Sequence, residues 1–192
     1  MSFDFSTLVT DRTESDAAYA KVLSGKGLNG MSNTEKAEWL SGLKGAYNAS
    51  DLNRVETAVA YLAETLRTLP DILKEYAASK GVAWDAFFDV PYDPLACDLT
   101  TKIDWSINDV PTFVQMKRYL SNVVTLCEAL SLDTTYLPDS MVKLNWQGAN
   151  AIEKALESLD RAIKALETEI KAFLDKTAAA WMYSGDLYAG EV

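Results

Sequence analysis

Three stretches of the chain space their apolar residues alternately three and four positions apart, which places those residues on one face of an α-helix. The first stretch runs from Leu52 to Leu66, the second from Phe113 to Leu130, and the longest from Ile152 to Phe173. Each stripe needs an apolar partner, and three stripes in one chain can bury one another. We therefore predict an all-α fold, a helical bundle of three long helices preceded by shorter N-terminal helices.

The third stripe predicts one helix over about residues 145–180, which would be roughly 54 Å long. Its alternation of Ile and Leu is also typical of a parallel two-stranded coiled coil, so a homo-oligomer is the alternative. The positions beside the stripe lack the complementary charges that would steer such a dimer; they are Asp160, Ala162, Glu167, Glu169 and Leu174. We prefer packing within the chain.

Helix-terminating residues predict where the first two long helices begin and end. Ser50 is a candidate N-cap for the first, and Pro70 is expected to end or kink it. A further helix over 71–80 would then close at Gly81. Asp109 is a candidate cap for the second long helix, whose opening turn would hold Pro111.

The N-terminal part carries two local signals. A short helix is expected over 11–23, and the capping-box spacing of Ser32 and Glu35 predicts another that continues through Trp39. Between them, Gly25–Gly30 has the letters of a dinucleotide-binding fingerprint. That fingerprint requires a preceding strand, whereas a helical segment precedes it here, so we interpret it as a flexible turn between helices.

The chain is expected to form a single helical domain over residues 1–192. Its predicted parts are short helices in 1–48, helices in 49–81, an irregular segment in 82–110, long helices in 111–182 and a short extended tail in 183–192. The tail is glycine-rich and too short for a helix. The irregular segment is long for a compact domain, which is typical of a functional loop or of a lid packed on the bundle.

Aromatic residues gather in the irregular segment. Trp84, Phe87, Phe88 and Tyr92 could form a partner- or sugar-binding surface, although such residues more often pack a loop onto the hydrophobic body. Acidic residues accompany them at Asp85, Asp89, Asp93 and Asp98. Their spacing is too sparse for a calcium loop, and helix capping or solvated charge explains them better.

The overall composition excludes several functions. Lys and Arg number 18 against 28 Asp and Glu, which gives a net charge of -10 and argues against binding nucleic acid or an anionic membrane surface. Histidine is absent, so the commonest general base and metal ligand are missing. We predict a protein that is not an enzyme and needs no cofactor. The two cysteines, far apart in sequence, and the lack of a signal peptide favour the cytoplasm at synthesis.

The stretch Trp39–Asn48 is expected to form a tight corner between two helices. Gly42, Gly45 and Asn48 suit the sharp turn, and Trp39 and Tyr47 would fix it. Arg54 is expected to hold the corner by hydrogen bonds to carbonyls or carboxylates.

These corner residues also carry a family resemblance. Thr10–Arg12, Glu38–Asn48, Ser50–Glu56, Leu137–Met141 and Tyr183–Glu191 are similar to small phage and prophage proteins of Gram-positive gut bacteria, and the segment around Pro111–Val123 adds to the likeness. The resemblance implies a structural component associated with a tail, baseplate or fibre. It brings no catalytic residue with it.

The leading functional hypothesis is therefore a non-enzymatic structural or adaptor protein of a phage-like particle. Its partners would be other phage structural proteins, and it would be found in the virion. Tyr183 and Tyr188 of the tail would serve as anchors, together with the aromatic loop. One alternative is a glycan- or receptor-binding module, which predicts that Trp84 or Trp105 is exposed. The least favoured is a carboxylate-dependent hydrolase.

Overall fold

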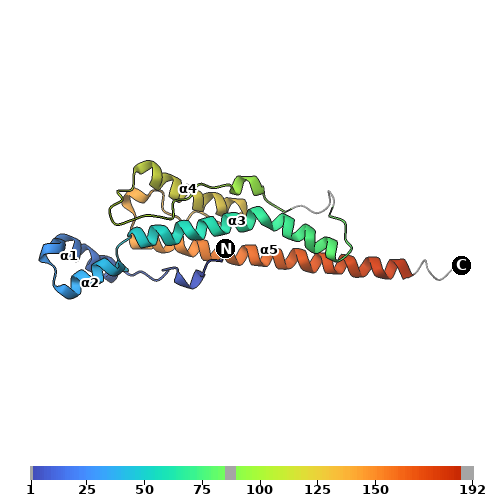
Figure 1. Cartoon of the computed structure of the whole chain (residues 1–192), viewed down its shortest axis with the longest axis horizontal. Coiled ribbons are helices and arrows are strands. Elements are labelled where there is room, and N and C mark those ends of the chain that lie inside the picture. The colour runs from blue at the N-terminus through green and yellow to red at the C-terminus, as the bar shows by residue number, and fades with distance from the viewer. Residues whose placement is uncertain (1, 85–89, 187–192) are drawn as a thin grey trace.

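The structure, a computed structural model, describes residues 2–84 and 90–186 of the chain. The described residues form helices and no strand, which confirms the all-α prediction (Figure 1). The elements are η1 (Phe5–Thr7), α1 (Glu14–Gly30), α2 (Asn33–Gly42), α3 (Ala49–Ser79), η2 (Pro94–Cys97), α4 (Phe113–Ala129), η3 (Met141–Lys143) and α5 (Trp146–Asp186).

The core lies where α3, α4 and α5 pack against one another. Their apolar stripes supply it: Leu62 and Leu66 come from α3, Val123 from α4, and Ile152 and Leu156 from α5, all fully or almost fully buried. Burying one such side chain contributes about 1.5–3 kcal/mol. These contacts make the three helices the stable body on which the other elements rest.

Helices α3 and α5 run parallel. Arg54 near the start of α3 bonds Glu153 near the start of α5, and Tyr76 near the end of α3 donates to Asp175 further along α5. A parallel arrangement requires the chain to return between helices. Residues 82–84 and 90–110 lie on that return path and hold only the short η2, in agreement with the predicted irregular segment.

The N-cap predicted for α3 is wrong by two residues. Asn48 caps this helix, its side chain accepting from the backbone N–H groups of Ser50 and Asp51. The Asp51 carboxylate in turn accepts from the Asn48 N–H at 2.9 Å. This reciprocal pair satisfies more backbone donors than Ser50 could alone, so the helix begins earlier.

Asp109 does not cap α4 as predicted. Thr112 is the cap, and it forms a capping box with Gln115. Asp109 instead accepts from the backbone N–H of Ser106 at 2.7 Å, which closes a turn before the helix. Pro111 therefore precedes the cap and lies outside the first turn.

Pro70 does not end α3. The helix continues to Ser79 and closes through Gly81, which has the left-handed φ of 70° that favours glycine, as predicted. Leu69 and Leu73 beside the proline are fully buried. Packing of these side chains offsets the loss of one helical hydrogen bond.

Helices α1 and α2 form a hairpin beyond the end of the bundle, here called the N-terminal hairpin (Figure 1). The capping box of Ser32 and Glu35 opens α2 as predicted. The turn predicted over Gly25–Gly30 is found at one residue: two helical pieces of α1 meet at a kink at Gly27, whose φ of 61° is not helical, and the residues on either side of it are helical. The hairpin contains few buried residues, so its outer surface faces solvent.

The predicted extended tail is also wrong as far as the structure describes it. Helix α5 continues through Tyr183 to Asp186. A glycine such as Gly185 in the last turn costs a helix only about 1 kcal/mol, which the preceding turns can overcome. Tyr188 lies outside the described residues.

Candidate functional site: the groove between the hairpin and the bundle

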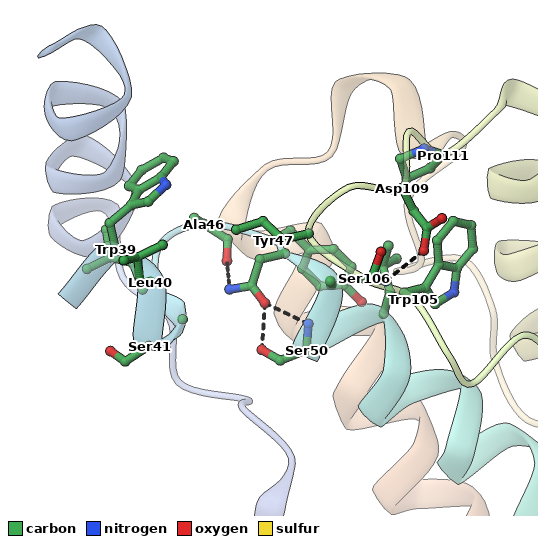
Figure 2. A pocket seen from close by; sticks show the side chains of 16 residues that line it. Trp39, Leu40, Ser41, Ala46, Tyr47, Ser50, Trp105, Ser106, Asp109 and Pro111 are labelled. Atoms are coloured by element: carbon green, nitrogen blue, oxygen red, sulfur yellow. Dashed lines mark hydrogen bonds between the residues drawn. The ribbon is translucent and has the colours of Figure 1, made fainter. Parts of the chain in front are cut away.

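A groove lies where the N-terminal hairpin meets the bundle (Figure 2). Its volume is about 450 Å³. We call it the junction groove. One wall is the last turn of α2 and the corner that follows, the floor is the start of α3, and the other wall is the loop before α4. Side chains that line it include Trp39, Leu40, Tyr47, Leu52, Trp105, Ile107, Asp109 and Pro111.

Both predicted corner glycines, Gly42 and Gly45, are required by the local geometry. Gly42 has a φ of 97°, a backbone conformation that side chains rarely adopt. A Cβ atom at Gly45 would lie 1.9 Å from the backbone oxygen of Asp16 in α1. The corner therefore packs directly on the backbone of the hairpin, and this close approach sets the position of the first wall.

Four charged side chains, three of them buried and Arg54 partly exposed, fasten the corner to the bundle. The Arg12 guanidinium donates to Asp51 (2.8 Å) and Glu153 (2.7 Å), while Arg54 donates to Glu153 (2.8 and 2.9 Å) and to Asp51. The Glu153 side chain is 0% exposed and that of Arg12 is 2% exposed. Two cations and two anions leave this charge network neutral, which is what burial requires.

As predicted, Arg54 forms hydrogen bonds to carboxylates. Its partners are Asp51 at the start of α3 and Glu153 in α5, so these bonds join the two helices. Glu153 was not singled out from the sequence; the signal available was its position directly after Ile152, which begins the predicted apolar stripe.

A segment before the hairpin is held by the same network. Residues 8–13, here called the N-terminal strap, contact α5 through backbone groups: the Val9 N–H donates to Glu153 at 2.6 Å. The Asn150 side chain makes two hydrogen bonds to the backbone of Arg12: it accepts from the backbone N–H at 2.9 Å and donates to the backbone carbonyl at 2.8 Å. The strap and the corner thus fix both ends of the hairpin to the bundle.

Tyrosines complete this anchorage. The hydroxyl of Tyr47 hydrogen-bonds that of Tyr119 on α4, and burial raises the pKa of both phenols. The Arg12 guanidinium carbon lies 5.4 Å from the centre of the Tyr47 ring. Tyr47 therefore lines the groove with a ring that is already fixed on its other side.

The second wall is held on α3 by equally specific contacts. The Asn53 side chain donates to the backbone carbonyl of Trp105 at 2.8 Å and accepts from the backbone N–H of Trp105 at 2.7 Å. Glu56 accepts from the Lys102 N–H at 3.0 Å and pairs with Arg118, while burial raises the pKa of the Glu56 carboxyl. Both walls are therefore preformed.

The rim of the groove exposes apolar side chains. Leu40 is 62% exposed and Ile107 is 76% exposed, and nearby Val110 is 86% exposed. Asp109 is the only charged residue that lines the groove among those described, and the N–H of Ser106 lowers the pKa of its carboxyl. Lys102 lies 3.8 Å from Asp109 but only 2.6 Å from Asp104, so one cation serves two carboxylates.

The aromatic loop is only partly within the described residues. Trp84 and Tyr92 are half-buried and pack on the bundle, and the Tyr92 hydroxyl donates to the carbonyl of Leu66 at 2.9 Å. Phe87 and Phe88 lie outside the described residues. The glycan-binding alternative predicted that Trp84 or Trp105 is exposed. Trp105 is only 5% exposed and Trp84 is half-buried, so neither side chain has the predicted exposure.

Two further findings concern the parts of the chain that the structure describes. They contain no cluster of three or more residues that could hold a metal ion. None of their helices is long and apolar enough to cross a bilayer.

The chain matches no protein-family model, no curated protein and no solved structure.

Proposed function

We propose that this protein is a non-enzymatic adaptor that holds partner proteins at the junction groove. The observation that carries the proposal is the exposure of Leu40, Ile107 and Val110 around a groove whose walls are preformed. Exposed apolar side chains gathered around a concave surface are typical of interaction sites. A preformed groove lowers the entropic cost of binding because its walls are already ordered.

The buried charged groups support a structural role over a catalytic one. Hydrolysis by carboxylates needs two of them facing one cleft, and at least one with a raised pKa. The carboxyl of Glu56 has a raised pKa, but it is buried against Arg118 and does not line the junction groove. Asp51 and Glu153 are held by arginines. Each buried carboxylate in the described part of the chain thus has a partner that explains its presence.

The proposed setting is a phage or phage-like particle, with other tail, baseplate or fibre proteins as partners. This part of the proposal rests on the sequence resemblance alone. An adaptor in such an assembly needs a rigid body with a defined docking surface, and the buried charge network and the capped helices supply rigidity here.

Site-specific photo-crosslinking in particle-producing cells tests the proposal. A photoreactive phenylalanine analogue at Ile107 should crosslink to one or a few defined proteins, and Leu40→Asp should abolish those products. The matched control carries the same analogue at Leu95, which is 80% exposed and does not line the groove. Equal crosslinking at both positions, or none at Ile107, would contradict the adaptor role.

Particle purification tests the setting separately. The protein should copurify with released particles at a constant ratio to the tail proteins. If the Ile107 crosslinks form but the protein is absent from particles, the adaptor role stands and the role as a particle component is overturned.

A further inference from the structure

The chemistry of the junction groove indicates which kind of partner segment it accepts. Its volume of about 450 Å³ lies within the range of roughly 300–1,000 Å³ that is usual for binding pockets. Leu40, Ile107 and Pro111 line it with apolar atoms that are open to solvent. An aliphatic or aromatic side chain of a partner would therefore bury apolar surface there.

The charge that lines the groove is negative. Asp109 is the sole charged lining residue in the described part of the chain, and the Ser106 N–H that it accepts favours its ionised form. Lys102 is shared with Asp104, so the three side chains together carry a charge of about -1. The chain as a whole carries -10. Both charges attract a basic segment and repel an acidic one.

Aromatic rings in the lining also suit a cation. The Arg12 guanidinium lies 5.4 Å from the ring centre of Tyr47, and the Lys102 ammonium lies 4.9 Å from that of Trp105. Trp39 is a third lining ring, half-buried at the end of α2. Figure 2 shows it projecting from α2 on the wall opposite Asp109 and Pro111. Because Tyr47 and Trp105 already face Arg12 and Lys102, Trp39 is the lining ring in the described part of the chain that an incoming Lys or Arg could meet.

We propose that the junction groove binds a segment of a partner protein in which an apolar side chain is next to Lys or Arg. The apolar side chain lies between Leu40 and Ile107, and the cation pairs with Asp109. This inference rests on the proposed adaptor function and names the chemistry of its partner. A second copy of this chain is disfavoured as the occupant because two chains of charge -10 repel each other.

Selection from a random peptide library displayed on ribosomes tests the inference. The immobilised full chain is the target, and the Leu40→Asp/Ile107→Asp variant serves for counter-selection. Both side chains are exposed, so the variant should keep its fold, which circular dichroism checks. We expect the enriched peptides to carry an apolar residue within two positions of Lys or Arg.

One enriched peptide, made synthetically, should shift the NMR signal of the Trp39 indole N–H. Asp109→Asn keeps the oxygen that accepts from Ser106 but removes the charge, and it should weaken binding about 2- to 5-fold, as expected for an exposed ion pair. The control Asp139→Asn, outside this groove, should leave the affinity unchanged. Added salt should weaken binding to the wild type more than to Asp109→Asn.

Three outcomes would overturn the inference. Groove-dependent enrichment of neutral or acidic peptides would refute the charge preference while leaving the adaptor function intact. No groove-dependent enrichment would refute a short linear partner segment, and the crosslinks at Ile107 would then decide the adaptor function by themselves. A dimer in analytical ultracentrifugation that the Leu40→Asp/Ile107→Asp variant abolishes would make a second copy the occupant.

Discussion

Replacing Arg12 with methionine should destabilise the whole protein, because it unbalances the buried charge network. The guanidinium donates to Asp51 and Glu153, and neither carboxylate has access to much solvent. Methionine keeps most of the apolar stem but removes the charge. Two buried carboxylates would then share the single guanidinium of Arg54.

The expected loss follows from this imbalance. Removing one partner of a buried ion pair costs about 3–5 kcal/mol, because a charge is left without compensation. The hydrogen bonds from Arg12 to the carbonyls of Val9 and Lys44 add about 1 kcal/mol each. We therefore expect a loss of roughly 5–7 kcal/mol, out of a total stability of about 5–15 kcal/mol for a domain.

Urea unfolding followed by circular dichroism measures the loss, and hydrogen exchange locates it. The midpoint should fall, and the amides of the N-terminal strap and hairpin should exchange faster than those of α3 and α5. The matched control is Lys44→Met. It removes an exposed pair with Asp11 and should cost no more than about 1 kcal/mol.

A double variant separates charge imbalance from lost packing. Arg12→Met combined with Glu153→Gln removes one charge of each sign, so it should be more stable than the sum of the single losses by about 0.5–3 kcal/mol. The reasoning is refuted if Arg12→Met alone costs less than about 1 kcal/mol, or if the two losses add without coupling.

Two further predictions concern the walls of the groove. Gly45→Ala should lower the free energy of unfolding, measured with urea, by about 1–3 kcal/mol, because the added Cβ would overlap the backbone of Asp16. The control Gly25→Ala, at an open helical position, should raise it by up to about 1 kcal/mol. Equal effects of the two substitutions would argue against the close contact at Gly45. Burial raises the pKa of Glu56, so the folded state binds that proton more tightly than the unfolded state. The stability of the wild type relative to Glu56→Gln should therefore be highest below the ordinary carboxyl pKa and should decline as pH rises through the folded pKa; a difference that does not change with pH would contradict this.

Local patterns in the sequence determined much of the fold. The apolar stripes predicted the helices around Leu62, Val123 and Leu156 because a helix repeats every 3.6 residues whatever its neighbours are. The capping box at Ser32 and the glycine closure at Gly81 were equally predictable, since each involves backbone groups within about five residues.

Competition between local signals was harder to resolve. Ser50 and Asn48 are both good caps, and only the reciprocal bond that the Asp51 carboxylate accepts from the Asn48 N–H favours Asn48. Pro70 is a helix breaker in isolation, but the buried leucines on either side of it keep α3 continuous. At Asn48 the reciprocal contact decided between two equally good caps, and at Pro70 tertiary packing outweighed a local cost of about 3 kcal/mol.

The candidate site is the part that only the tertiary structure decided. Its corner residues were predicted from turn chemistry, but Arg12 and Glu153 are 141 residues apart in sequence and meet because α3 and α5 run parallel beside the N-terminal strap. The groove likewise joins Leu40 to Ile107 through a loop that returns along the bundle. Hydrogen bonds within a helix depend on neighbours in sequence, whereas these contacts depend on how whole helices pack, and sequence periodicity does not specify that arrangement.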